Sequence, residues 1–445
     1  MRLRRYAKIT SMAVPDETSP RRARGDRAVV GLVAGFSVLR ILAIRFTPLV
    51  YVDSADYRHL DVLGGARRSF TVPLLYALMP SDGWRVVEQA AISALAWVVL
   101  ALVVARDVAD RRVRLAALAT ILSCGLTTQV TNWDSAILSD SITISLTVLL
   151  IAACMHLRRS PTPGAVTAAF GVTLLWTFAR ELHVYLVVIF AIVALIVAAV
   201  RRGAGRSLVL AAGLVVIAAL GVAADRRNED TANENLAGVI GGRILPDDSA
   251  RSWFVAEGMP ALTQFAPGQS VPREALQAVP SFERWVESQG LATYAHYLLT
   301  HPAAAITGPY GDLLEERATY AEPHSLRPVL LSPAEAYGRA RPVLPPVLED
   351  VLFDPGRTGS ILALCALALI ATASARSRLG ADQRRLVPLL TLASVLPYVF
   401  LAWLGSVFEP GRHAMPGAVA LRVGVLALLA VLADAWIAQR EVDGA

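Results

Sequence analysis

Four short polar stretches, each next to a long apolar run, hold the residues best suited to chemistry. The stretch YVDSADYRHL, residues 51–60, places Asp53 and Asp56 three residues apart. The other three are TNWDSAILSDSI with Asp134 and Asp140, FARELH with Arg180, Glu181 and His183, and FEPGRHAMP with Glu409, Arg412 and His413. Ionisable groups at membrane depth are costly unless they face a cavity and find partners. Their recurrence therefore predicts one shared site.

Carboxylates and arginines together indicate a particular chemistry. A carboxylate near a low-dielectric boundary can act as the base for an attacking hydroxyl group. Arginine suits the opposite task, because its planar fork holds a phosphate through two parallel hydrogen bonds. Structural interpretations stay open: Arg180 and Arg412 could anchor at the lipid head groups, and Glu409 could simply pair with Arg412 three residues later.

The composition is that of a membrane protein. Of the 445 residues, 55% are apolar and only 18% are charged, against roughly a quarter charged in soluble domains. An apolar helix needs roughly 17 to 25 residues to span a bilayer. We therefore predict an all-α polytopic fold with ten spans, near residues 28–48, 86–105, 113–130, 137–157, 164–180, 183–200, 206–224, 357–375, 386–405 and 414–436.

The arginine distribution predicts the orientation. Positive charge concentrates in cytoplasmic loops, and arginines cluster after the spans that end near 105, 157, 200 and 375. The short loops on the opposite side hold only Arg180 and Arg412. Both chain ends are thus expected in the cytoplasm, with the four polar stretches facing outward. The surplus arginine indicates topology rather than nucleic-acid binding.

The remaining segments give a predicted domain organisation. Residues 1–27 are polar and form a flexible cytoplasmic tail, and 28–224 form a transmembrane catalytic module. Its first outer loop, 46–85, contains apolar pieces too short to span, which predict interfacial helices. Residues 225–356 form a mostly helical extracytoplasmic domain, and 357–445 hold the last three spans. Arg422, inside the last span, is expected to pair with a buried group such as Glu88.

These motifs resemble the glycosyltransferase-C superfamily, which includes protein mannosyltransferases and the aminoarabinose transferases of lipid A. The resemblance rests on the aspartate pair after the first span, followed by RRSFTVPLLYALMP. NWDSAILSDSI is similar to the family stretch in which an acidic residue opens the fourth span, and FARELHVYL and FEPGRHAMP resemble its arginine-bearing outer loops. Many relatives have more spans, and some have Glu where this chain has Asp140. The segment 225–356 resembles one in actinobacterial membrane proteins.

The resemblance implies a membrane glycosyltransferase that moves a sugar from a polyprenyl-phosphate donor to a glycan, lipid or protein acceptor of the cell envelope. The site would face outward from a bacterial cytoplasmic membrane. Asp53 and Asp56 would be catalytic, with Asp53 the favoured base, and Arg180 and Arg412 would bind the donor phosphate. The cavity wall would contain Asp140, Glu181, His183, Glu409 and His413. No cofactor is required, although some relatives use a divalent metal.

The location independently favours a lipid donor. Nucleotide sugars are absent outside the membrane, and the sequence has no Gly-rich nucleotide fingerprint between a strand and a helix. Two other classes stay open. A surface-polysaccharide ligase or polymerase would depend on arginines of the large outer loops and not on Asp53. A transporter or flippase would show broken helices and inverted repeats.

Overall fold

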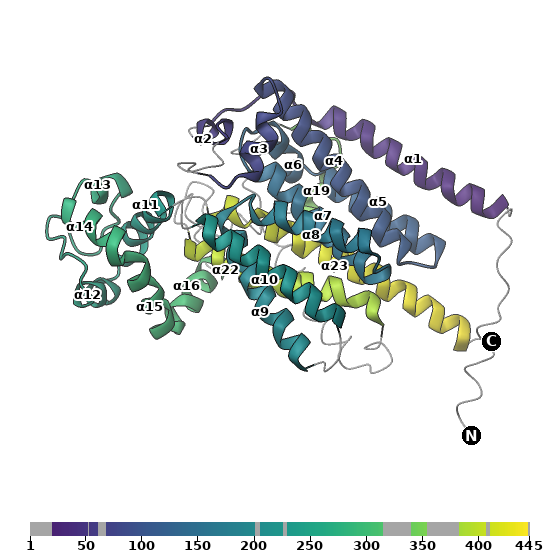
Figure 1. Ribbon diagram of the computed structural model, residues 1–445. Coiled ribbons are helices and arrows are strands. Elements are labelled where there is room, and N and C mark those ends of the chain that lie inside the picture. The colour runs from purple at the N-terminus through teal and green to yellow at the C-terminus, as the bar shows by residue number, and fades with distance from the viewer. Residues whose placement is uncertain are drawn as a thin grey trace.

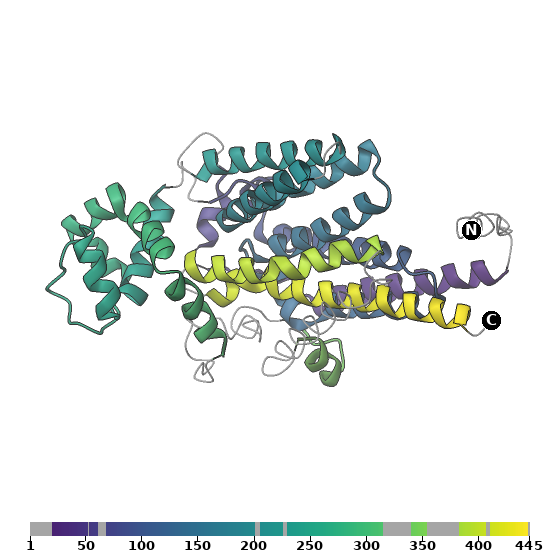
Figure 2. The ribbon, with the colours of Figure 1, turned by 90° about the horizontal axis from the view of Figure 1, so that it is seen from below.

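The computed structural model describes residues 20–51, 53–60, 68–200, 205–225, 229–314, 340–353, 382–405 and 410–443. These residues are almost entirely helical: they contain no strand, and Leu49 and Ala136 form an isolated bridge. A bundle of long helices lies beside a smaller helical domain, and the start of the first helix and the end of the last helix lie at the bundle end far from that domain (Figure 1). The view from below shows the same separation (Figure 2).

The long helices coincide with the predicted spans wherever those fall on described residues. They are α1 (Pro20–Ala43), α4 (Asp82–Arg106), α5 (Arg111–Leu126), α7 (Asp140–Arg159), α8 (Pro163–Thr177), α9 (Glu181–Val200), α10 (Gly205–Asp225), α22 (Leu386–Gly405) and α23 (Pro410–Asp443). Helix α1 already begins at Pro20, inside the segment predicted as a tail. The predicted span 357–375 lies outside the described residues.

Five helices in the described part of the chain are long and apolar enough to cross a membrane. They occupy Asp82–Arg106, Asp140–Arg159, Glu181–Val200, Gln383–Gly405 and Arg412–Glu441. Helix α5 and the segment Thr128–Ser135 give a sixth candidate if their 51° bend lies within one span. The apolar helices Pro163–Thr177 and Leu208–Ala224 are shorter. The chain is an all-helical, multi-pass membrane protein, and the full set of ten spans stays a prediction.

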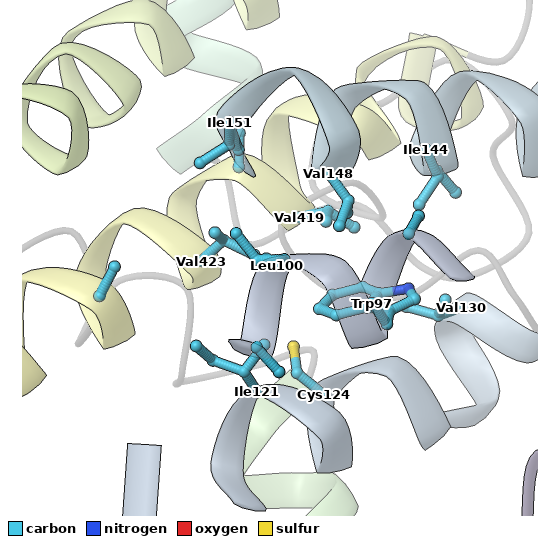
Figure 3. Packing of buried hydrophobic residues seen from close by; sticks show 14 of the residues in the cluster. Trp97, Leu100, Ile121, Cys124, Val130, Ile144, Val148, Ile151, Val419 and Val423 are labelled. Carbon is cyan, nitrogen blue, oxygen red and sulfur yellow. The ribbon is translucent and has the colours of Figure 1, made fainter. Parts of the chain in front are cut away.

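The bundle core is centred on Trp97 of α4, whose side chain is fully buried. Figure 3 shows its ring among Cys124 of α5, Val148 of α7 and Val419 of α23. A Cβ atom at Gly125 would lie 2.6 Å from the Trp97 ring. Glycine at this position therefore lets α5 approach α4 closely, as small residues do where membrane helices pack.

The two ends of the bundle carry different sets of charged residues. At one end Asp107 accepts hydrogen bonds from Arg158 and Arg159. Asp434 likewise accepts hydrogen bonds from Arg384 and from the backbone of Asp110. This end contains the arginine-rich turns that we predict to be cytoplasmic. The stretches predicted to face outward gather at the opposite end, beside the short helices α2 (Ser54–Arg58) and α3 (Thr71–Ala77).

The smaller domain is helical, as predicted. It contains α11 (Glu229–Val239), a π-helical turn Ile240–Ile244, α12 (Asp248–Ala256), α13 (Arg273–Gln277), α14 (Pro280–Trp285), a second π-helical turn Val286–Gly290, α15 (Leu291–Thr300) and α16 (Pro302–Leu314). Its core includes Phe254 and Phe282, both fully buried. The domain contacts the end of α22, where Tyr294 donates a 3.1 Å hydrogen bond to the Leu404 carbonyl. The Arg243 guanidinium lies 3.6 Å from the centre of the Trp403 ring.

Helix α19 (Pro346–Phe353) corrects two expectations. It falls inside the predicted outer domain, yet Leu352 and Phe353 are buried in the core of the bundle. Arg422 does not pair with Glu88. Its Nε donates a 2.7 Å hydrogen bond to the Leu352 carbonyl, and its guanidinium lies 3.9 Å from the centre of the Phe353 ring. A backbone carbonyl and an aromatic face thus contribute to the stabilisation of this buried cation.

Candidate functional site

The site is built where the first outer loop meets the segment before α7. The backbone N–H of Leu49 donates to the Ser135 carbonyl at 2.8 Å, and the N–H of Ile137 donates back to the Leu49 carbonyl at 2.9 Å. The Ser54 hydroxyl then donates to the Ile137 carbonyl at 2.7 Å. These bonds fix the loop beside the start of α7. They thereby bring Asp53 and Asp140, which lie far apart in the sequence, to the same end of the bundle.

A buried ion pair holds the segment before α7 in place. Arg40 of α1 lies 2.5 Å from Asp134, and both side chains are 1% exposed. The other Asp134 oxygen accepts a 2.6 Å hydrogen bond from Ser141, in the first turn of α7. Gln89 of α4 donates to the backbone carbonyl of Asp134 at 3.3 Å. Three helices are thus tied to Asp134, in the turn that precedes α7.

Asp140 is the centre of the ionic cluster. Its side chain is 1% exposed, and one oxygen forms an ion pair with Arg180. The other oxygen lies 3.2 Å from Nε of Arg412. A buried carboxylate is stable only when cations and hydrogen bonds compensate its desolvation, and two arginines supply this here. Its position in the first turn of α7 adds the favourable field of the helix dipole.

Asp53 and Asp56 lie on the more open side of the cluster. The Asp53 side chain is 37% exposed, and its Oδ2 lies 3.5 Å from Nη2 of Arg412. Arg68 bridges the aspartate pair, 3.3 Å from Asp53 and 3.4 Å from Asp56. The favoured base is therefore in direct contact with one of the two arginines predicted to bind phosphate.

Arg68 is held as a permanent cation. Burial disfavours its charge, but the interactions with Tyr57, Glu181 and the aspartate pair raise its pKa above the ordinary arginine value. Its guanidinium also lies 5.2 Å from the centre of the Tyr57 ring. Sequence reasoning noted Arg68 beside the aspartate pair but did not assign it to the site. Only the fold shows that it contacts both carboxylates.

Hydroxyl groups complete the inner side of the cluster. Ser139 Oγ accepts a 3.1 Å hydrogen bond from Nε of Arg180 and lies 3.1 Å from the Tyr57 hydroxyl. The Tyr76 hydroxyl donates to the Leu138 carbonyl at 2.7 Å. Burial raises the pKa of Tyr76 well above its ordinary value, so this phenol stays protonated. Of these three residues, only Ser139 lies next to Asp140 in the sequence, so the two tyrosines could not be assigned to the site without the fold.

The other predicted site residues have different surroundings. Glu181 accepts a 3.3 Å hydrogen bond from Ser69, next to Arg68. The backbone carbonyl of His413 accepts a 3.4 Å hydrogen bond from Arg180. His183 is fully buried between helices, where it stacks on Trp176.

Both ring nitrogens of His183 have partners, namely the Trp176 carbonyl and, at 2.9 Å, the Tyr398 hydroxyl. These contacts give His183 a packing role between α8, α9 and α22 rather than an exposed position. Glu409 lies outside the described residues.

The described carboxylates of the cluster lie beside arginines. Among the described residues, no group of three or more His, Cys, Asp or Glu side chains is placed to hold a metal ion. Asp53, Asp56 and Asp140 instead each face at least one guanidinium group. The cations that the described part of the cluster offers to a negatively charged ligand are arginines.

Two hollows lie elsewhere on the molecule. A cavity of about 510 Å³ on the small domain is lined by Asp248, Arg251 and Pro267. A groove of about 460 Å³ between α9 and α10 is lined only by apolar side chains, from Val188 to Ala223. Neither touches the ionic cluster, which is defined by its convergent charges and not by a deep cavity.

The fold and the cluster define an all-helical membrane protein with carboxylates and arginines gathered at one end. No protein-family profile and no curated protein matches the chain. Among solved structures, it is similar to the archaeal oligosaccharyltransferase AglB from Archaeoglobus fulgidus, solved with an inhibitory peptide and a dolichol-phosphate. The identity is 12% and the TM-score 0.42, and the match covers 94% of this chain and 52% of that one. The chain thus spans about half the length of that protein.

Proposed function

We propose that the chain is a membrane glycosyltransferase of the glycosyltransferase-C type, which moves a sugar from a polyprenyl-phosphate donor to a cell-envelope acceptor. The observation that carries this proposal is the contact between Asp53 and Arg412 at 3.5 Å. It places a partly exposed carboxylate beside a cation, so that a hydroxyl and a phosphate bound there would be neighbours. Such positioning is a large part of what a group-transfer enzyme supplies.

The reaction uses Asp53 as the general base. Asp53 accepts the proton of the acceptor hydroxyl while the hydroxyl oxygen forms a bond to the anomeric carbon of the donor sugar. The bond between that carbon and the phosphate oxygen breaks, and its electron pair leaves with the polyprenyl phosphate. The 37% exposure of Asp53 gives an acceptor access to it. The buried Asp140 has no such access, and its role is to hold Arg180 and Arg412 in place.

Arginines stabilise the leaving group. The departing phosphate gains negative charge in the transition state, and fixed cations at that position lower the barrier. Arg412 is the first candidate, because it contacts both Asp53 and Asp140. Arg68 and Arg180 lie on either side of it in the cluster, and they would share the phosphate charge. Asp56 contacts Arg68 and orients it.

The orientation is part of the proposal. The arginine-rich turns around Asp107 and Asp434 lie at the bundle end opposite to the cluster. If positive charge marks the cytoplasmic side, the cluster faces outward from a bacterial cytoplasmic membrane. A lipid-linked sugar is then the activated donor available to it.

Binding of a polyprenyl phosphate tests this proposal without knowledge of the sugar. The full-length protein in lipid nanodiscs is titrated with undecaprenyl phosphate, and binding is measured by native mass spectrometry. Arg412→Ala should weaken binding at least ten-fold. Arg58→Ala is the matched control, because Arg58 lies in the same loop but pairs with Asp82 outside the cluster. The proposal fails if the wild-type protein does not bind this lipid, or if the two variants weaken binding equally.

A further inference from the structure

A second group of aromatic and ionisable side chains lies on the small domain, far along the chain from Asp53 and Arg412. It comprises Trp253 and Glu257 of the α12 region and His296, Tyr297 and His301 of the α15 region, and we call it the histidine–tryptophan platform. The Trp253 ring is central: its centroid lies 5.5 Å from that of His296 and 5.3 Å from that of His301. The reaction proposed above uses none of these residues.

The hydrogen bonds around His301 fix its tautomer. Its Nδ1 lies 3.2 Å from the Tyr297 carbonyl and 3.0 Å from the Thr300 hydroxyl. A carbonyl only accepts, and the Thr300 hydroxyl already donates to the His296 carbonyl at 2.8 Å. Nδ1 therefore carries the proton, and Nε2 is left as the acceptor on the opposite edge of the ring. The ring is also held by stacking on Tyr297, with centroids 4.6 Å apart.

His296 is oriented in a similar way. Its Nδ1 lies 3.7 Å from the Glu257 carboxylate, which favours a proton on that nitrogen. The His296 and Glu257 side chains are 54% and 42% exposed. Both groups can thus exchange their water for a ligand. The two imidazole rings lie next to the partly buried indole of Trp253.

The chemistry of the platform selects a neutral, polyhydroxylated ring. The negative face of an indole attracts the polarised C–H groups of a sugar, and the apolar body of the ring packs against them. Imidazole nitrogens and a carboxylate accept hydrogen bonds from several hydroxyl groups at once. The platform contains no arginine or lysine, so it lacks the cations that a phosphate or a nucleic acid requires. Its polar groups also make the platform unsuitable for an apolar lipid tail.

The platform is joined to the end of the bundle that carries the ionic cluster. Tyr294, on the same helix as His296 and Tyr297, donates a 3.1 Å hydrogen bond to the Leu404 carbonyl at the end of α22. The next described helix after α22 begins at Pro410 and carries Arg412. A glycan bound at the platform would therefore be held by the same domain that contacts this end of α22.

We infer that the histidine–tryptophan platform is a sugar-binding subsite that holds the glycan acceptor by stacking one ring on Trp253. The sugar-binding role rests on the platform geometry, whereas the acceptor role rests on the function proposed above. The subsite commits the protein to an acceptor that contains at least one neutral sugar residue. Transfer to an acceptor without sugars would not need it.

Saccharide binding tests the inference directly. The full-length protein is purified in a detergent without a sugar head group and mixed with trisaccharides of mannose, arabinose, glucose and galactose. Saturation-transfer NMR then measures binding. At least one trisaccharide should bind the wild-type protein, and Trp253→Ala should weaken that binding at least ten-fold. Trp436→Ala is the matched control, because Trp436 is 51% exposed on α23, outside the platform.

A second variant covers the case in which Trp253→Ala disturbs the domain. His296→Ala removes an exposed side chain and should weaken saccharide binding several-fold without changing the unfolding temperature. The inference is overturned if none of the trisaccharides binds the wild-type protein, or if both variants bind as tightly as Trp436→Ala does. Undecaprenyl phosphate binding separates the two proposals. If the saccharide binds at the platform while that lipid does not bind, the platform stands and the proposed transferase function fails.

Discussion

Arg412 Nη2 lies 3.5 Å from Asp53 Oδ2, which joins the loop after α1 to the start of α23 across the whole length of the chain. The same guanidinium reaches Asp140 at 3.2 Å through Nε. Asp140 is buried, whereas Asp53 is 37% exposed. One arginine thus connects a structural carboxylate to an accessible one, and the two aspartates should respond differently to mutation.

Replacement of Asp140 should destabilise the protein. Asp140→Asn removes the carboxylate that pairs with Arg180 and lies 3.2 Å from Arg412, and loss of one partner of a buried ion pair costs about 3–5 kcal/mol. Unfolding in mixed detergent micelles, followed by tryptophan emission, measures the change. Asp53→Asn is the control and should cost less than about 1 kcal/mol, because the Asp53 side chain is 37% exposed to solvent. Equal destabilisation by the two variants would contradict the structural role of Asp140.

The Arg40–Asp134 pair should behave as a coupled unit. Arg40→Met leaves Asp134 buried and unpaired, with an expected cost of about 3–5 kcal/mol. The double variant Arg40→Met/Asp134→Leu replaces both charges by apolar groups and should regain most of that loss. The control is Arg159→Met, because Arg159 is 51% exposed and its loss should cost about 1 kcal/mol or less. Additive losses in the double variant would show that the two side chains do not interact.

The orientation can be measured in cells. Reporter proteins are fused after residue 290, in the turn before α15, or after residue 445. The two fusions should report opposite sides of the membrane, with residue 445 in the cytoplasm. The reason is the concentration of arginine in the turns at the bundle end that holds Asp107 and Asp434. A cytoplasmic signal at residue 290 would reverse the orientation and remove the argument for a lipid-linked donor.

The helices were more predictable from sequence than the site was. An apolar run must satisfy its own backbone hydrogen bonds inside a bilayer, so composition alone locates most of the long helices. The partners of an ionisable residue depend on contacts between distant segments. The sequence predicted that Asp140 lines the cavity and that Arg180 binds the phosphate, but it did not show their ion pair. It also did not assign Arg68 to the site, because that arginine lies in a long loop whose path only the fold determines.

Contacts between distant segments also determine the surroundings of Arg422 and of Gly241. Arg422 was expected to pair with a buried group such as Glu88, but its guanidinium contacts the carbonyl of Leu352 and the ring of Phe353. In GVIGGRILPDD two adjacent glycines, which are common in loops, lie in a π-helical turn that continues α11 through Ile244. A Cβ atom at Gly241 would lie 2.2 Å from the Val271 carbonyl oxygen, so this glycine serves close packing and not a turn. The local sequence does not distinguish a glycine that allows close packing from a glycine that forms a turn.

The most direct test of the central claim measures sugar transfer and donor binding on the same variants. The full-length protein in nanodiscs receives undecaprenyl-phosphate-linked mannose, arabinose or glucose together with a glycan acceptor, and the released undecaprenyl phosphate is quantified. Asp53→Asn should slow transfer by at least ~10², as expected for a lost general base, while lipid binding stays unchanged. Asp82→Asn, in the same loop but outside the cluster, should transfer normally. Full activity of Asp53→Asn, Asp56→Asn and the double variant would contradict the account.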